Sequence, residues 1–169
     1  IDLGLESLFP MEDIAIMGIG EILSNYRFLK KRIAETAKAV IAASPDALIT
    51  VDSPDFNLRV AELVKKKIDI PHIHYVAPSV WAWRPKRAKK ISKIVDTLLC
   101  LFPKEPYFFR NFDLDCLFVG HPAVQNFSKL NNRTVIYNKL GIEDKNEVII
   151  ALLPGSRKNE VKKTLPILI

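Results

Sequence analysis

Ala47-Leu48-Ile49-Thr50-Val51-Asp52-Ser53-Pro54-Asp55-Phe56-Asn57 is the stretch that decides the fold class. Its first five residues form an apolar run with little alternation, which is typical of a strand buried on both faces of a parallel sheet. Ser53-Pro54-Asp55 predicts a turn, and a helix is expected over 56–67 with Leu58, Ala61 and Val64 on one side. The stretch therefore predicts a strand, a turn and a helix, with Asp52 at the carboxyl end of the strand.

The same order of elements recurs along the chain. Further apolar runs predict strands over 72–76, 97–102, 116–119 and 148–153, and helical patterns fall over 14–40, 88–94, 106–111 and from 157 onward. Strands that alternate with helices in this way indicate an α/β fold, with a Rossmann-like parallel sheet.

The domain organisation follows from a change in composition. Residues 1–125 read as most of one Rossmann-like domain that lacks its first strand, the more polar residues 126–146 as an inter-domain connection, and residues 147–169 as the truncated start of a second domain. The chain begins at Ile1 without an initiator Met and stops at Ile169 within an apparent helix, so we expect it to be an internal fragment.

Composition narrows the class of protein. Of 169 residues, 49% are hydrophobic and 26% are charged, which is ordinary for a globular protein. The 25 Lys and Arg exceed the 19 Asp and Glu, which favours an anionic partner. No nucleic-acid-binding motif is visible, so nucleic acid is not expected as a partner. The cysteines, Cys100 and Cys116, have no metal-ligand spacing, and Cys100 is interpreted as a reduced core thiol.

Ligands of open α/β sheets bind beyond the carboxyl ends of the strands. Asp52 lies at such an end, where a carboxylate can take a proton from an attacking hydroxyl. Asp55 and Asn57 follow it closely and are candidate substrate-binding residues. The alternative for Asp55 is that it caps the following helix, since Asp is favoured at the N-cap.

A second candidate region is Ala77-Pro78-Ser79-Val80-Trp81-Ala82-Trp83-Arg84-Pro85-Lys86-Arg87. Flat aromatic surfaces beside cations suit a phosphorylated sugar or a lipid headgroup, because Arg binds phosphate through a forked donor. Ser79, Trp81, Trp83 and Arg84 are the candidate substrate-binding residues. The alternative is one buried Trp followed by a solvated basic helix face.

Histidines form a third group of candidates. His121 follows Gly120 at the end of a predicted strand, where Gly lets backbone approach a ligand closely, although a structural role is the alternative. His72 and His74 alternate along one strand and so share a face, but no third ligand is in sight, and no metal site is predicted.

The fourth candidate is Leu152-Leu153-Pro154-Gly155-Ser156-Arg157-Lys158-Asn159-Glu160. A strand, a tight Gly turn and a helix N-terminus form an anion site, because backbone N–H groups and the helix dipole point at the ligand. In an enzyme that uses a sugar nucleotide, this turn would hold the diphosphate, and Arg157 would add a positive charge. Gly155, Ser156 and Glu160 are candidate substrate-binding residues. A plain strand–turn–helix junction is the alternative.

Taken together, these motifs resemble the lipid-A-disaccharide synthase family over nearly the whole chain, and in the family's order. The resemblance rests on runs 17–19, 52–57, 74–84, 119–122 and 152–157, of which the tryptophan-containing run is the most specific. The family's Gly-Ser-rich first strand loop and most of its second domain have no counterpart here.

The resemblance implies part of a GT-B glycosyltransferase fold, with an acceptor-side first domain and a second domain that binds the nucleotide sugar. It implies an inverting transfer from UDP-2,3-diacylglucosamine to 2,3-diacylglucosamine 1-phosphate (lipid X), which yields lipid A disaccharide 1-phosphate and UDP without a cofactor or metal. Asp52 matches the family's candidate general base and Arg157 its essential arginine. Activity of this piece alone is not expected.

Acylated substrates imply a cytoplasmic enzyme that is peripheral on the inner membrane. Ile16, Met17 and Phe28 beside Lys30 and Lys31 combine apolar and cationic side chains, which is the pattern that holds a helix on an anionic membrane surface. The alternative is that most of this helix packs on the sheet.

Two other functions remain open from the sequence. One is a different GT-B enzyme that uses UDP-N-acetylglucosamine, which assays with acyl-free and diacyl donors would separate. The other is a non-catalytic basic module that binds lipid or RNA, for which steeply salt-dependent RNA binding would be the sign.

Overall fold

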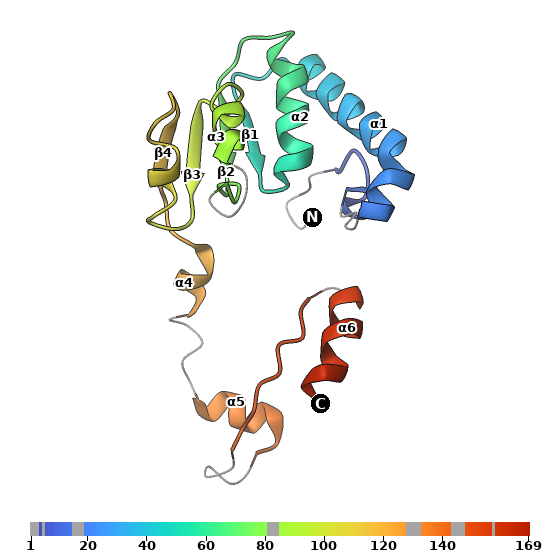
Figure 1. Ribbon diagram of the computed structural model, residues 1–169, viewed down its shortest axis with the longest axis vertical. Helices are drawn as coiled ribbons and strands as arrows, with labels where there is room; N and C mark the ends of the chain where they lie inside the picture. The colour runs from blue at the N-terminus through green and yellow to red at the C-terminus, as the bar shows by residue number, and fades with distance from the viewer. Residues whose placement is uncertain are drawn as a thin grey trace. The chain divides into compact units, whose positions relative to one another are not determined.

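The computed structural model describes residues 4, 6–14, 19–80, 85–127, 133–142, 148–156 and 158–169. The chain divides into two compact units, Ile1–Val124 (unit 1) and Gln125–Ile169 (unit 2) (Figure 1). Each unit is described by itself.

Unit 1 is built on a parallel sheet of four strands. These are β1 (Leu48–Val51), β2 (His72–Tyr75), β3 (Thr97–Cys100) and β4 (Asp115–Phe118), in the order β1-β2-β3-β4. In the register, Thr50 pairs with His74, His74 with Leu98, and Leu98 with Cys116. The predicted Rossmann-like parallel α/β arrangement is confirmed.

Helices α2 (Pro54–Lys65) and α3 (Pro85–Ile91) cover one face of the sheet. The core on this face joins Leu58 and Ala61 of α2, Ile91 of α3, and Leu98 and Cys100 of β3, all of which are buried. The predicted placement of Leu58, Ala61 and Val64 on the buried side of one helix is therefore confirmed. The short 3-10 helix η2 (Pro106–Phe108) lies between β3 and β4 in the chain.

Helix α1 (Ile19–Ala43) packs on α2 (Figure 1). Its residues Ile33 and Ala37 are buried with Phe56 and Val60 of α2 in a second core cluster. The prediction placed this helix over 14–40, whereas the 3-10 helix η1 (Met11–Asp13) precedes it and the helix extends to Ala43. Tyr26 of α1 is 49% exposed.

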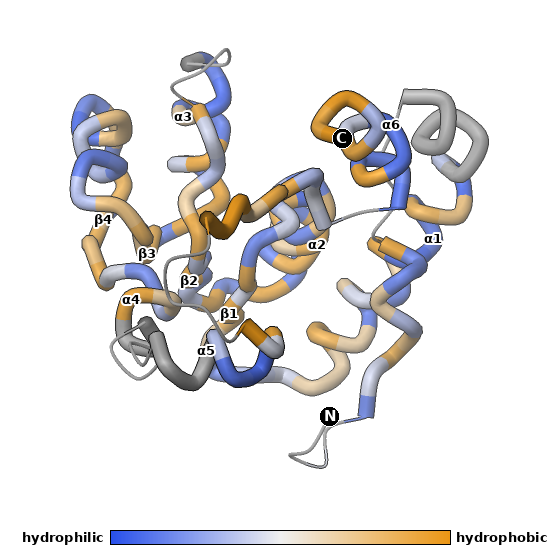
Figure 2. Tube along the Cα trace, turned by 90° about the horizontal axis from the view of Figure 1, so that it is seen from below, coloured by the Kyte–Doolittle hydropathy of each residue, from blue (hydrophilic) through white to orange (hydrophobic). Residues whose placement is uncertain are grey.

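The other face of the sheet is apolar and exposed. Along β1 only Thr50 is buried, whereas its neighbours Ile49 and Val51 are 65% and 58% exposed, and Leu117 of β4 is 48% exposed. Alternate residues of a strand point to opposite faces, so these side chains lie on the face away from α2 and α3. The prediction that β1 is buried on both faces is therefore wrong. Figure 2 shows the hydrophobic colouring along these strands.

Helix α4 (Pro122–Phe127) spans the division between the units, and unit 2 continues with α5 (Arg133–Leu140) and α6 (Lys158–Leu168). The strand predicted over 148–153 is not formed: these residues are exposed, with Val148 at 89% and Leu153 at 84%. An apolar run becomes a strand only when a neighbouring strand accepts its backbone hydrogen bonds, and the described residues of unit 2 contain no such strand.

Candidate functional site

The candidate residues of unit 1 lie along one edge of the sheet. All four strands are parallel, so the loops after them begin at the same edge, and Asp52, Ser79 and His121 belong to the loops after β1, β2 and β4. Asp52 and His121 follow the two outer strands, about 14 Å apart at the usual strand spacing. They therefore follow strands that β2 and β3 separate, and a ligand that contacts both would extend across the ends of those two strands.

Asp52 stands in a strained turn. Asp52 and Ser53 both adopt left-handed backbone conformations, with φ of 51° and 40°. Such conformations cost roughly 1 to 3 kcal/mol each for residues other than Gly, and they cluster at functional sites. The Asp52 N–H donates to the carbonyl of Tyr75 at 2.9 Å, which extends the pairing of β1 with β2 by one residue. The Asp52 carboxylate is left exposed beyond the strand end.

Asn57 holds this turn in place. Its Nδ2 donates to the carbonyl oxygens of Val51 at 3.0 Å and of Asp52 at 2.7 Å. The carbonyl of Ser53 accepts from the N–H groups of Phe56 and Asn57. Asn57 thus positions the backbone that carries Asp52, and the predicted contact of Asn57 with substrate stays a prediction.

Asp55 is not the helix cap. Ser53 occupies the N-cap of α2 and makes no side-chain capping bond, so the alternative that Asp55 caps this helix is wrong. Pro54 lacks an N–H and has a helical φ, so it takes the first helical position and the helix begins before Asp55. Asp55 Oδ1 instead accepts from Arg87 Nη2 of α3 at 2.7 Å.

The loop after β2 is described only up to Val80. Val76 has a φ of 80°, and its N–H donates to the carbonyl of Leu99 at 3.0 Å. Ala77 and Val80 are buried, whereas the side chain of Ser79 is exposed. The predicted substrate-binding residues Trp81, Trp83 and Arg84 lie outside the described residues.

His121 is fixed at the start of α4. Its Nδ1 accepts from the N–H of Ala123 at 3.1 Å, and its ring lies 5.9 Å from the ring of Phe102 in the loop after β3. With Nδ1 as acceptor, the neutral imidazole carries its proton on Nε2. Gly120 has a φ of 82°, which explains the Gly before this His.

Thr50 of β1 and the two histidines of β2 form a buried polar cluster beneath the carboxyl ends of these strands. Thr50 Oγ1 lies 2.8 Å from His72 Nε2 and 2.7 Å from His74 Nδ1, and His72 Nδ1 lies 3.0 Å from the carbonyl of Ile94. That carbonyl can only accept, so neutral His72 is protonated on Nδ1, and Thr50 donates to His72 and accepts from His74. His74 Nε2 is then an acceptor, and it is buried without a partner in the described structure.

Burial keeps both histidines neutral. Burial lowers the pKa of His72, and it lowers the pKa of His74 to about 4. A positive charge on His72 would lower the pKa of His74 further, whereas the Asp52 carboxylate raises it. The alternating His72 and His74 were predicted to share a face, and this is confirmed. Thr50, their partner, was not singled out from the sequence, although it is the polar residue within the apolar run of β1.

In unit 2, Gly155 and Ser156 precede α6, and Arg157 lies outside the described residues. Gly155 has a φ of 115°, and a Cβ on it would lie 2.8 Å from the side chain of Glu160. The Ser156 N–H donates to Glu160 Oε2 at 3.3 Å. The Glu160 carboxylate therefore occupies the position that an anion would take at this N–H, and a diphosphate must displace it to bind there.

Of the proposed membrane residues, Phe28, Lys30 and Lys31 lie on α1. Phe28 is 38% exposed, and the Arg32 guanidinium stands 4.9 Å from the centre of its ring. Lys30 and Lys31 are exposed, and Lys31 lies 3.8 Å from Glu35. Ile16 and Met17 lie outside the described residues. Within the described part of the chain, no helix is long and apolar enough to cross a membrane.

A parallel sheet with polar side chains at its carboxyl edge and helices on one face places unit 1 among the Rossmann-like α/β folds. Comparison with known families narrows this class. The family model described as lipid-A-disaccharide synthetase matches residues 2–169. The chain belongs to the lipid-A-disaccharide synthase family, whose fold is that of the GT-B glycosyltransferases.

Individual relatives agree with this assignment. The lipid-A-disaccharide synthase of Ruegeria pomeroyi is 50% identical over 165 residues, covering 97% of this chain and 41% of the relative. That of Rhodospirillum centenum is 45% identical over 164 residues (96% and 41%), and that of Gluconobacter oxydans is 41% identical over 165 residues (98% and 39%). The chain thus spans about two fifths of the length of the curated relatives it matches.

Proposed function

We propose that the full-length protein is an inverting glycosyltransferase that moves 2,3-diacylglucosamine from UDP to the 6-hydroxyl of 2,3-diacylglucosamine 1-phosphate. Family membership supports the reaction. The observation that carries it in this chain is the exposed Asp52 carboxylate, raised beyond β1 on a strained turn that Asn57 holds in place.

In this mechanism, Asp52 takes the proton of the acceptor hydroxyl as its oxygen attacks the anomeric carbon. The bond to UDP breaks on the opposite face of the sugar, so the configuration inverts. Ser79, Trp81, Trp83, Arg84 and His121 are proposed to contact the acceptor from the neighbouring loops. Arg157, with the N–H of Ser156, is proposed to stabilise the charge on the departing diphosphate once Glu160 has moved aside.

We further propose that residues 1–125 belong to the acceptor-side domain, that 126–146 connect the domains, and that 147–169 begin the domain that binds the nucleotide sugar.

The substitution Asp52→Asn in the full-length protein tests the chemical step. The kcat is expected to fall by about 10²- to 10⁴-fold, the usual contribution of a general base, with KM nearly unchanged. A matched control is Asp46→Asn, because Asp46 is exposed at the opposite end of the same strand. Turnover by Asp52→Asn close to that of the control would remove Asp52 from this role.

The donor identity needs a separate assay. Transfer from UDP-2,3-diacylglucosamine is compared with transfer from UDP-N-acetylglucosamine by the same preparation. Preference for the acyl-free donor would move the protein to another GT-B activity.

We also propose that α1 and the residues before it contact an anionic membrane surface, with Ile16, Met17 and Phe28 entering the interface and Lys30 and Lys31 near the headgroups. The exposure of Phe28 and of the two lysines supports this. In vesicle flotation of the full-length protein, changing Met17 and Phe28 to Ser should reduce binding to vesicles that contain anionic lipid. Leu63→Ser is the control, because Leu63 is a similarly exposed apolar residue on α2. Equal flotation of both variants would argue against the surface.

A further inference from the structure

A groove of about 630 Å³ runs between α2 and α3, on the covered face of the sheet. This volume is within the range of small-molecule pockets. Both helices begin at the carboxyl edge of the sheet, and Pro54 and Asp55 at the start of α2 line the groove. One end of the groove therefore lies only two to three residues along the chain from Asp52.

The floor of the groove is apolar. Leu58, Ile91 and Ile94 line it, and each is less than one tenth exposed. They belong to the core between the helices and the sheet. Because their side chains are aliphatic, they offer no hydrogen-bonding group to a ligand. An occupant that reaches this floor must itself be apolar at that end.

The rim is basic. Two ion pairs bridge the helices across it: Arg87 to Asp55 at 2.7 Å, and Lys90 to Glu62 at 3.5 Å. These pairs use both carboxylates of the lining, whereas Arg59 and Lys86 also line the groove, are exposed, and form no ion pair with any residue that the structure describes. The rim thus carries a net positive charge that favours an anionic head.

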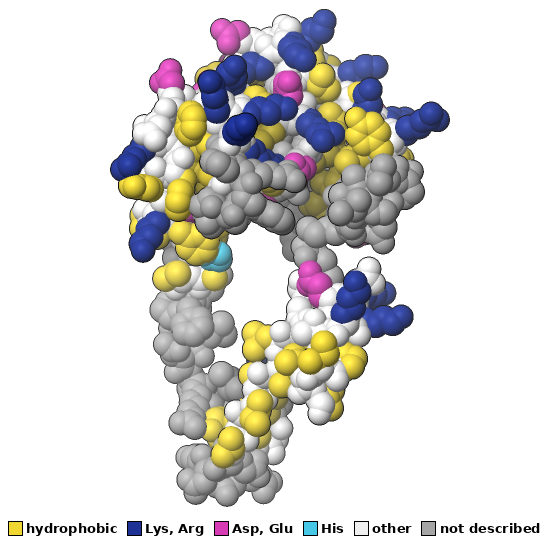
Figure 3. Space-filling view, in the orientation of Figure 1, with side chains coloured by type: hydrophobic (Ala, Val, Ile, Leu, Met, Phe, Trp, Pro, Cys, Tyr) yellow, Lys and Arg dark blue, Asp and Glu magenta, His cyan; other side chains and the backbone are white. Residues whose placement is uncertain are grey.

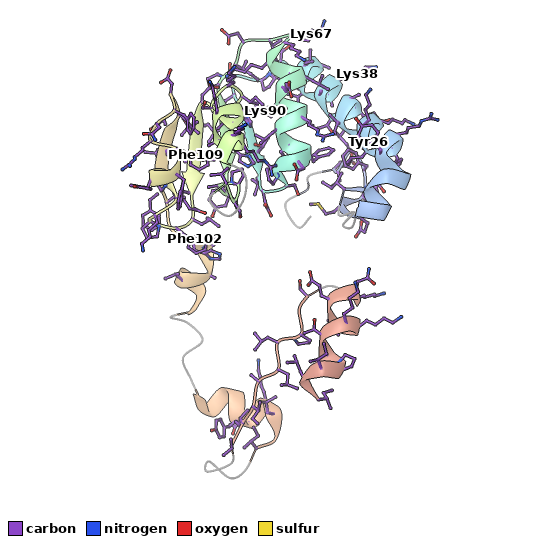
Figure 4. All side chains as sticks on the ribbon, in the orientation of Figure 1. Tyr26, Lys38, Lys67, Lys90, Phe102 and Phe109 are labelled. Atoms are coloured by element: carbon purple, nitrogen blue, oxygen red, sulfur yellow. The ribbon has the colours of Figure 1, made fainter. Side chains whose placement is uncertain are left out.

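Figures 3 and 4 agree with this picture. Figure 3 shows Lys and Arg side chains gathered over α2 and α3 with hydrophobic side chains among them, and Figure 4 shows Lys90 between the two helices.

An apolar floor beneath a cationic rim matches an amphiphile that has one hydrocarbon chain and one anionic group. We propose that the α2–α3 groove binds an acyl chain of a phosphate-bearing amphiphile, with the phosphate near Arg59 and Lys86. On the proposed function, which this identification of the ligand rests on, the amphiphile is the diacylated acceptor, whose sugar is then held at the carboxyl edge beside Asp52.

The first test measures binding of dodecyl phosphate to the full-length protein by calorimetry, below the concentration at which the probe forms micelles. Arg59→Trp places a bulky ring in the groove from its exposed rim without altering the core. The expected loss of affinity is at least about tenfold, because keeping even two methylene groups out of an apolar site has roughly that effect. Leu63→Trp puts the same ring on an exposed position of α2 outside the groove and should bind like wild type.

A second variant separates charge from space. Lys86→Glu leaves the floor intact and should weaken dodecyl phosphate while leaving dodecyltrimethylammonium no weaker, which also covers the case that Arg59→Trp fails to fold. Inorganic phosphate alone should compete poorly. The proposal is overturned if dodecyl phosphate does not bind, if neither variant weakens it, or if inorganic phosphate competes as well as the amphiphile does.

Turnover then separates this proposal from the proposed function. Arg59→Trp should raise the KM for the diacylated acceptor by about tenfold and leave the KM for the UDP donor unchanged. An inactive wild-type protein that binds dodecyl phosphate in the groove would refute the glycosyltransferase and keep the groove. Normal kinetics of Arg59→Trp with the acylated acceptor would refute the groove and keep the enzyme.

Discussion

The buried histidines predict that the chain begins to lose stability as the pH falls below about 6.5. His74 is fully buried, and its pKa falls from the ordinary 6.5 to about 4 in the folded state. Below pH 6.5, His74 therefore binds a proton in the unfolded chain but not in the folded chain, so the free energy of unfolding falls as the pH falls. At about 1.4 kcal/mol for each pKa unit, His74 alone removes about 3 kcal/mol by pH 4. His72 acts in the same direction, because burial lowers its pKa as well.

This is a large share of the roughly 5 to 15 kcal/mol that stabilises a typical domain. Urea unfolding of the chain, followed by circular dichroism at pH 7 and at pH 4.5, measures it. The variant His74→Leu removes both the titrating group and the acceptor that lacks a partner, so it should flatten the dependence on pH by most of that amount.

Leu98→Ala is the control, since Leu98 is the register partner of His74 and is fully buried. It should lower stability by about 2 to 5 kcal/mol at both pH values and leave the difference between them unchanged. A wild-type chain equally stable at both pH values would refute the reasoning, as would a His74→Leu chain that keeps the wild-type slope.

Three further outcomes are expected. Thr50→Val should lower the free energy of unfolding by about 2 kcal/mol or more in urea titrations, because it strips partners from two buried ring nitrogens. Asn57→Ala should lower it by about 1 to 2 kcal/mol and, in the full-length protein, lower kcat more than it raises KM, since the turn that carries Asp52 loosens; equal effects on binding and turnover would contradict this. Gly155→Ala should reduce the helical signal of α6, because the new Cβ meets Glu160 and the backbone is left-handed there; an unchanged spectrum would contradict the contact.

The sheet of unit 1 could be predicted from the sequence because its strands are short apolar runs separated by helical periodicity. An apolar run over 148–153 likewise predicted a strand, but none is formed there. Hydropathy shows that a segment favours burial, but it does not show whether a neighbouring strand is present to accept its backbone hydrogen bonds. Likewise, the apolar run of β1 was expected to be buried on both faces, but whether a second face is covered depends on distant segments.

The candidate site could be predicted in part. That Asp52 stands at the carboxyl end of a strand follows from local sequence, and the structure places it there. The hydrogen bond from Arg87 to Asp55 could not be foreseen, because it joins residues 32 positions apart on two helices. The polar cluster of Thr50, His72 and His74 was visible only as alternating histidines, because the strand register that supplies their partner arises in the folded sheet.

The bare side of the sheet has a practical consequence for anyone who handles this piece of the protein in isolation. The side chains of Ile49, Val51 and Leu117 form an apolar surface that is exposed to water. Among the described strands, β1 is also an edge strand, so one side of its backbone has donors and acceptors without a partner strand. In concentrated solution, copies should adhere through this surface and come out of solution unless a detergent or a few well-placed lysines shield it.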